Sequence, residues 1–194
     1  VVANGTGLNP DKADLHAPLL RPVELADAFQ SQSDGGLLAN KGVIDVFNCL
    51  RRRDEMSFAG GVFVIVRCDN AKTWDLLRGK GHVVAQNTKT AMLFIGQHTL
   101  GVEAPMSILS AALLNLPTGA VAPEPRIELV ARVTRDFKQG ETLHITDLHH
   151  HAVAGLDPEL RDAERDHSSS PVPYYIATGR TIVTDVKKGT VLTW

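Results

Sequence analysis

The chain has 194 residues, of which 43% are apolar and 22% charged, and its formal net charge at pH 7 is −2. This length predicts one domain or two small ones with a sizeable core, and the balanced charge gives no basis for a nucleic-acid or anionic-membrane partner. No apolar stretch approaches the roughly 18 residues of a membrane span, and two cysteines cannot build a disulfide framework, so we expect a cytoplasmic protein with no membrane partner.

The first 120 residues alternate between helical and strand patterns, which indicates an α/β arrangement with a mixed or antiparallel sheet. The charged turn at residues 51–55 separates two strand-like runs and favours an antiparallel pair between them. Met106, Leu109, Leu113 and Leu116 recur at helical spacing and predict the buried face of a helix. In chain order we expect a helix at 23–29, strands at 43–50 and 61–66, and helices at 71–80 and 105–116.

The composition of the sequence changes after Leu116. Residues 118–126 (TGAVAPEPR) contain two prolines and one glycine, which is typical of a linker. We therefore expect two domains, at residues 1–120 and 121–194, and an α+β fold class for the whole. The second domain reads as a small all-β module, with short strands expected at 127–133, 141–145, 149–153, 174–177, 181–183 and 190–194.

An internal repeat marks this second domain. Residues 136–143 (DFKQGETL) and 185–192 (DVKKGTVL) both spell D-x-K-x-G-x-x-L, 49 residues apart. The glycine suits a tight turn with positive φ, and the leucine begins the next strand. Two copies are too few for a solenoid, so we expect a pseudo-symmetric pair of hairpins that share one core.

Short motifs for cofactors and metals are weak in this sequence. Residues 4–7 (NGTG) contain G-x-G without the preceding strand or third glycine of a dinucleotide fingerprint. No P-loop, G-x-S-x-G or H-E-x-x-H motif is present. His149 and His151 share one face of an alternating strand that also carries His150, and a third metal ligand would have to be His144 or His167. A polar strand edge is the favoured interpretation of this run of histidines, so the metal site stays unknown.

Titratable residues stand where a strand meets a helix, at residues 92–105 (MLFIGQHTLGVEAP). An apolar strand there leads into a turn that carries His98 and Glu103, and an apolar helix follows at once. Groups at a helix N-terminus are well placed for acid–base chemistry or anion binding. The alternative interpretation is that Glu103 only caps the helix and that His98 binds a loop carbonyl.

Several segments together resemble the deoxyxylulose-phosphate reductoisomerase-like group of bacterial oxidoreductases, which is related to homoserine dehydrogenases. The segments that carry this resemblance are A-N-G-T-G-L at 3–8, G-G-L-L at 35–38, G-V-F-V at 61–64, H-T-L-G-V-E at 98–103 and S-I at 107–108. The doubled D-x-K-x-G-x-x-L resembles the SAF domain, a β-clip fold at the C-terminus of that family. The resemblance therefore implies a truncated catalytic domain followed by a SAF-like domain.

The resemblance also implies a function and a site. Family members bind NAD or NADP in a domain that precedes these residues, so we expect a C-terminal piece of a longer enzyme that alone binds no cofactor and is inactive. The substrate would be a small hydroxylated carbonyl compound, phosphorylated or not, and a divalent metal could assist. His98 and Glu103 would be catalytic, the substrate would contact Asn4, Gly5, Thr6 and Gly7, and the enzyme would form a homo-oligomer.

A second interpretation of the sequence assigns the protein to a different functional class, that of non-catalytic binding modules. SAF domains also occur in flagellar-assembly chaperones and in antifreeze-like modules, where they bind protein or sugar without catalysis. Under this reading residues 127–194 carry the function, and the first half is a scaffold.

Overall fold

The computed structural model describes residues 1–55, 57–58, 60–120, 122–147, 152–164 and 170–194. They form two compact units, one of Pro10–Ala122 and one of Val1–Asn9 with Pro123–Trp194. The division near residue 122 lies close to the expected linker, whereas the first nine residues join the β-rich unit. Helices and small sheets both occur, so the fold class is α+β.

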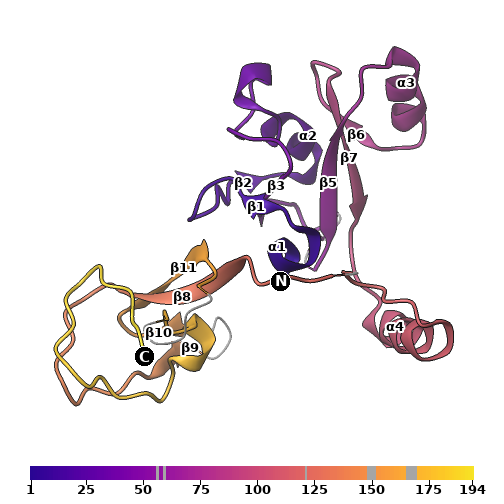
Figure 1. Cartoon of the computed structure of the whole chain (residues 1–194). Coiled ribbons are helices and arrows are strands. Elements are labelled where there is room, and N and C mark those ends of the chain that lie inside the picture. Colours follow the sequence, from indigo (N-terminus) through magenta and orange to yellow (C-terminus); the bar gives the residue numbers. More distant parts are fainter. Residues whose placement is uncertain (56, 59, 121, 148–151, 165–169) are drawn as a thin grey trace. The chain divides into compact units, whose positions relative to one another are not determined.

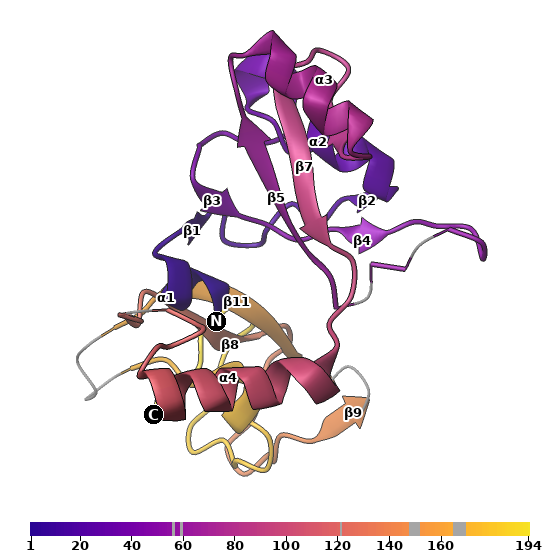
Figure 2. The ribbon, with the colours of Figure 1, turned by 90° about the vertical axis from the view of Figure 1, so that its right-hand side faces the viewer.

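A three-stranded antiparallel sheet forms the centre of the unit at Pro10–Ala122 (Figure 1). β5 (Val62–Arg67) pairs along its length with β7 (Thr90–Ile95), which also pairs with the short β6 (Val83–Val84). Figure 2 shows β5 and β7 side by side. The strand expected at 61–66 is confirmed. Its side chains alternate, because Phe63 and Ile65 pack against the core while Val62 and Val64 are exposed.

Phenylalanine rings dominate the core beside this sheet. Phe63 contacts Phe47 and Phe29, with ring centroids 5.5 and 5.4 Å apart, and Phe58 contacts Phe94 at 5.7 Å. Such tilted and edge-to-face pairs add specificity to the apolar burial. The fully buried members of the core include Leu25, Ala26, Ala85 and Met92.

The helices expected at 23–29 and 71–80 are both present. The first is a 3₁₀ turn, η1 (Pro22–Glu24), that continues into α2 (Leu25–Ala28), and Pro22 stands where a helix needs no N–H. The second is α3 (Ala71–Gly79). The side chain of Asn70 caps α3 by accepting a hydrogen bond from the Lys72 N–H at 3.0 Å.

The prediction of one strand at 43–50 paired with 61–66 is wrong. Only β3 (Val43–Ile44) and β4 (Asn48–Cys49) form there; β3 pairs with β1 (Asn9–Pro10), and β4 runs parallel to β2 (Leu19–Leu20). Asp45 explains the break. Its carboxylate accepts hydrogen bonds from the Val46 N–H at 2.8 Å and the His16 N–H at 3.0 Å. These two backbone N–H groups are therefore bound by a side chain and not by the carbonyls of a neighbouring strand.

The long helix α4 (Leu100–Leu114) begins earlier than expected, and its predicted buried face is wrong. Met106, Leu109 and Leu113 are 59%, 49% and 75% exposed, and Leu116 lies beyond the helix end and is also exposed. No described residue of α4 is buried. Apart from a polar stripe of Glu103, Ser107 and Ser110, the helix is apolar. Helical spacing predicts which side chains share a face, but it does not show whether another element covers that face.

The β-rich unit is built on a long antiparallel pair. β8 (Ile127–Val133) confirms the first expected strand, and its partner is β11 (Leu156–Asp162), which the sequence pattern did not predict. Pro158 pairs with Ala131, whose own N–H donates to the Val172 carbonyl and whose carbonyl accepts the Leu192 N–H. The ladder therefore needs no N–H from position 158, so a proline fits inside the strand.

Among the described residues, the other expected strands of this unit form only in part, and residues 149–151 of the strand expected at 149–153 lie outside the described residues. The segment at 174–177 is wrong as a strand, because the 3₁₀ turn η3 (Tyr174–Ile176) forms there after Pro173. Residues 181–183 and 190–194 make isolated bridges only. The core packs around Phe137, Leu143 and Val133. The other described elements of the chain are α1 (Val2–Thr6), η2 (Gln32–Asp34), β9 (Ile145–Asp147) and β10 (Ala152–Val153).

The two repeat copies face each other in the β-rich unit. The backbones of Phe137 and Val186 exchange two hydrogen bonds, of 2.9 and 3.0 Å. The repeat is a reciprocal clasp, in which the aspartate of each copy binds the lysine of the other. The two ion pairs are Asp136–Lys187 at 2.8 Å and Asp185–Lys138 at 2.7 Å.

Among the helices of the described residues, none has the length and hydropathy that crossing a membrane requires.

Candidate functional site

His98 and Glu103 lie in contact at the start of α4, next to the end of β7. Nδ1 of His98 is 3.2 Å from Oε2 of Glu103. Oε1 of Glu103 accepts hydrogen bonds from the Thr99 N–H at 3.1 Å and the Thr99 hydroxyl at 3.2 Å. The expected proximity of the two residues is therefore present, and Glu103 also caps α4, as the alternative interpretation requires.

The electrostatics of this pair fix its protonation. The Thr99 N–H is the largest cause that holds the pKa of Glu103 below its ordinary value of 4.5, and the Thr99 hydroxyl and His98 add to it. An ionised Glu103 only accepts, so Nδ1 of His98 donates to it and Nε2 is left as the reactive nitrogen. The side chains are 41% and 45% exposed, so a ligand can reach the imidazole.

Asn4, Gly5, Thr6 and Gly7 lie in the other unit, in and just after helix α1. Oδ1 of Asn4 accepts the N–H groups of Arg126 and Ile127, at 3.0 and 2.9 Å, and its Nδ2 donates to the Ile127 carbonyl at 3.1 Å. The amide of Asn4 therefore binds the start of β8. Substrate binding by these four residues stays a prediction.

The geometry of residues 4–7 does not fit a dinucleotide phosphate. Gly7 is the left-handed C-cap of α1, with φ 75°, and its N–H donates to the Ala3 carbonyl. A phosphate cradle uses free N–H groups at a helix N-terminus. In this helix Gly7 stands at the opposite end, so the G-x-G of residues 4–7 does not have the geometry of such a cradle.

The described residues also bring together no group of three or more His, Cys, Asp or Glu side chains that could hold a metal ion. Four of the five histidines considered as ligands, His149, His150, His151 and His167, lie outside the described residues. His144 is described and exposed.

Sequence reasoning missed a buried polar cluster around His16. Nδ1 of His16 is 2.6 Å from Oδ2 of Asp45, and its Nε2 is 3.8 Å from Oδ2 of Asp11. Burial would raise the pKa of Asp11, but hydrogen bonds from Ala39 and Asn40 outweigh it, so that pKa is lowered. The nearest sequence signal is a lone histidine, and its partner Asp45 is 29 residues away.

A second missed carboxylate is Asp34, which is 7% exposed and lies 2.5 Å from both Lys89 Nζ and Arg67 Nη1. The hydrogen bond from Lys89 is the largest cause that lowers the pKa of Asp34 to about 2. Because both cations neutralise this carboxylate, it joins the loop at 31–36 to β5 and to the turn before β7.

Comparison with known proteins gives one family. Residues 1–104, which are more than half of the chain and include His98 and Glu103, match the model described as the catalytic domain of oxidoreductase DRL. No curated protein matches the chain. The chain therefore belongs to the oxidoreductase DRL family.

Proposed function

We propose that these residues form part of an NAD(P)-dependent oxidoreductase, of reductoisomerase-like or homoserine-dehydrogenase-like type, that acts on a small hydroxylated carbonyl compound, phosphorylated or not. The observation that carries the proposal is the contact between His98 and Glu103 inside the matched segment. As the family resemblance implies, the proposal places NAD or NADP in a domain outside these 194 residues.

In this proposal His98 is the general acid. Nε2 of His98 donates a proton to the carbonyl oxygen of the substrate as negative charge develops there. Glu103 accepts the Nδ1–H, which orients the ring and leaves Nε2 directed to the substrate. The Thr99 hydrogen bonds keep Glu103 ionised and aimed at the imidazole. If the pair served only to cap α4, the helix would require Glu103, and the substitution of His98 would leave the activity unchanged.

For the β-rich unit we propose a SAF-like β-clip domain that supports assembly of a homo-oligomer. The reciprocal clasp between the repeat copies supports the β-clip assignment, because it gives the sequence repeat a pseudo-symmetric structural role within the chain. A divalent metal is left as an optional component of the enzyme.

The test uses the full-length gene product that contains these residues, assayed by NADH and NADPH oxidation with hydroxylated aldehydes and ketones, phosphorylated and not. His98→Gln should lower kcat by about 100-fold or more and remove one limb of the pH profile. Glu103→Gln keeps an acceptor for Thr99 and should shift that limb, while His144→Gln, an exposed histidine in the other unit, serves as the matched control.

Two results would contradict the proposal. One is an active enzyme in which His98→Gln has the kcat and pH profile of the parent. The other is nicotinamide-cofactor binding by the 194-residue chain alone in calorimetry, since the proposal places the cofactor elsewhere.

A further inference from the structure

One face of the three-stranded sheet in the unit at Pro10–Ala122 is apolar and uncovered. Val62 and Val64 of β5 lie opposite Ile95 and Leu93 of β7, so these four side chains share one face of the sheet. All four are exposed in the described chain. The solvent-facing side of an antiparallel sheet is normally polar, so this face has the composition of a buried one.

Helix α4 carries a second uncovered apolar surface. Val102, Met106, Leu109 and Leu113 follow one another at steps of four, three and four residues, so they form a single stripe along the helix. All four side chains are exposed, as are their neighbours in α4. A contiguous group of large exposed apolar side chains marks an interaction site.

The sheet face and the α4 stripe match in length and in chemistry. The 15 residues of α4 span about 22 Å, and the six residues of β5 or of β7 span about 20 Å. Neither surface contains a charged residue, because the one charged residue of α4, Glu103, lies off the stripe and caps the helix. The helix can therefore lie along the sheet face and cover both strands.

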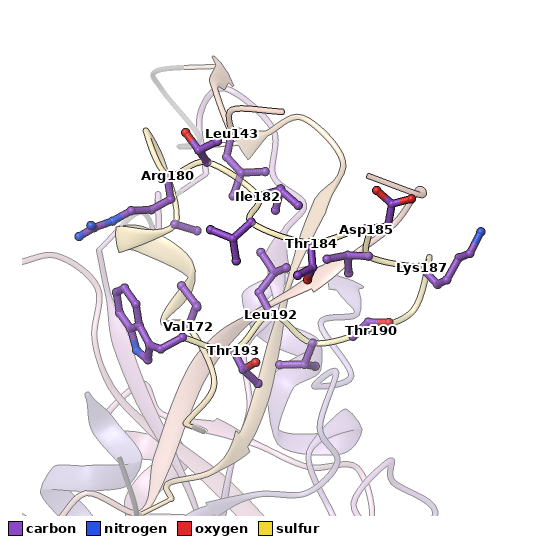
Figure 3. A pocket seen from close by; sticks show the side chains of 16 residues that line it. Leu143, Val172, Arg180, Ile182, Thr184, Asp185, Lys187, Thr190, Leu192 and Thr193 are labelled. Atoms are coloured by element: carbon purple, nitrogen blue, oxygen red, sulfur yellow. The ribbon is translucent and has the colours of Figure 1, made fainter. Parts of the chain in front are cut away.

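A hollow of about 680 Å³ in the β-rich unit, shown in Figure 3, is a poorer acceptor for α4. Its lining includes the charged side chains of Arg180, Asp185 and Lys187. An apolar helix offers these groups no hydrogen-bond partner and would remove water from them, which is unfavourable. The uncharged sheet face is therefore the surface that α4 fits.

We propose that α4 of one copy packs on the β5–β7 face of a second copy of this chain, and that the second copy returns the same contact. Two-fold symmetry closes such a pair and leaves neither surface exposed. Each buried CH₂ or CH₃ group removes roughly 30 Å² from water, so covering the eight half-exposed side chains in both copies buries on the order of 1,000 Å². This area reaches the size that a specific interface requires.

The chemistry of α4 favours a second copy over a lipid surface. The helix contains no Lys or Arg, whereas helices that lie on a membrane surface carry basic residues on their polar face. The contact is separate from the assembly proposed for the β-rich unit, since both of its surfaces belong to Pro10–Ala122. It also does not depend on the oxidoreductase chemistry.

Sedimentation velocity of the whole chain, over a range of concentrations, tests the proposal. The chain should form a pair with about twice its mass of 21.0 kDa. The double variants Met106→Gln, Leu109→Gln in the helix and Val64→Thr, Ile95→Thr in the sheet should each raise the dissociation constant about tenfold or more. Gln suits a helix and Thr a strand, and none of the four positions belongs to a core. Leu76→Gln, which changes an exposed leucine of α3, is the matched control and should leave the constant unchanged.

Cross-linking identifies which surfaces meet. A Val64→Cys chain is mixed with an isotope-labelled Leu109→Cys chain and oxidised, and peptide mass spectrometry should find a disulfide between positions 64 and 109 of different copies. A link between two copies of position 109 alone would show that the helices pair with each other. A link from 64 to 109 within one copy would show that the helix folds back on its own sheet.

Either of these two links in place of the expected one would overturn the proposal. So would a chain that stays monomeric at every concentration, whether or not it binds lipid vesicles, and so would a pair whose dissociation constant either double variant leaves unchanged. If a double variant fails to fold, the cross-linking result decides by itself, and the absence of a link between positions 64 and 109 of different copies counts against the proposal.

Discussion

The side-chain amide of Asn4 makes three hydrogen bonds with backbone groups of Arg126 and Ile127, which lie 122 and 123 positions after it in the chain. Asn4 therefore joins two segments that are distant in sequence. The family resemblance predicts residues 4–7 as substrate contacts. In the described chain Asn4 also has a structural task, since its side chain binds the start of β8. A fold-stabilising role and a substrate role make different demands on the side chain, so they can be separated.

Asn4→Ala should lower the free energy of unfolding by about 1–3 kcal/mol, because it leaves partly buried backbone groups without their partner. Asn4→Asp keeps both accepted hydrogen bonds but sets a carboxylate oxygen against the Ile127 carbonyl, so it should also be destabilising. Asn9→Ala, an exposed asparagine nearby, is the matched control. Chemical denaturation measures all three variants, and an Asn4→Ala chain as stable as Asn9→Ala would show that these hydrogen bonds contribute nothing.

Single residues also explain where sequence reasoning succeeded at the candidate site. His98 and Glu103 are five positions apart across a helix start, and this short separation made their contact predictable. The contact between His16 and Asp45 was not predictable, because it spans 29 positions and has no motif. Local geometry is encoded in spacing, whereas distant pairs depend on how the chain folds back.

At the scale of elements, the predictions succeeded where a run of residues carried its own periodicity or cap. β5, β8 and α3 are examples, and the Asn70 cap marks the start of α3. They failed where a side chain replaced the backbone as a hydrogen-bond partner, as Asp45 does at residues 43–50. β11 was missed because Pro158 and four charged residues hide a strand whose stability comes from pairing with β8.

The clasp between the repeat copies gives an element-scale prediction about pH. The hydrogen bond from Lys187 is the largest cause that lowers the pKa of Asp136, and that from Lys138 does the same for Asp185. A lowered folded-state pKa means that each carboxylate stabilises the fold above its ordinary pKa of 3.8. This contribution is lost as the pH falls through the lower folded-state values.

The double variant Asp136→Asn, Asp185→Asn tests this linkage. At pH 7 it should melt below the parent, and the difference in Tm should shrink as the pH falls below 3.8. Calorimetry at a series of pH values from neutral to acid measures it, with Asp157→Asn, an aspartate in the same unit and outside the clasp, as control. A Tm difference that stays constant down to the most acid sample would show that the ion pairs do not carry the effect.

At the scale of the whole molecule, the division into Val1–Asn9 with Pro123–Trp194 and Pro10–Ala122 follows from two separate cores. Phe137 and Leu143 belong to one core, and Leu25 and Met92 to the other. The expected linker at residues 118–126 lies close to this division. It could not predict that the first residues belong to the second unit, because that assignment depends on the hydrogen bonds of Asn4.

Separate cores predict separate unfolding transitions. Leu25 and Leu143 are 0% and 2% exposed, so Leu25→Ala and Leu143→Ala are matched cavity-forming changes, each expected to cost about 2–5 kcal/mol in its own unit. In calorimetry of the whole chain, Leu25→Ala should lower one transition and Leu143→Ala the other. Equal effects of both variants on one shared transition would mean that the two units unfold as a single cooperative block.

The exposed apolar side chains of α4 belong to neither core, so Leu113→Ser should leave both transitions in place. This variant is the control, because it removes an apolar side chain without removing part of a core.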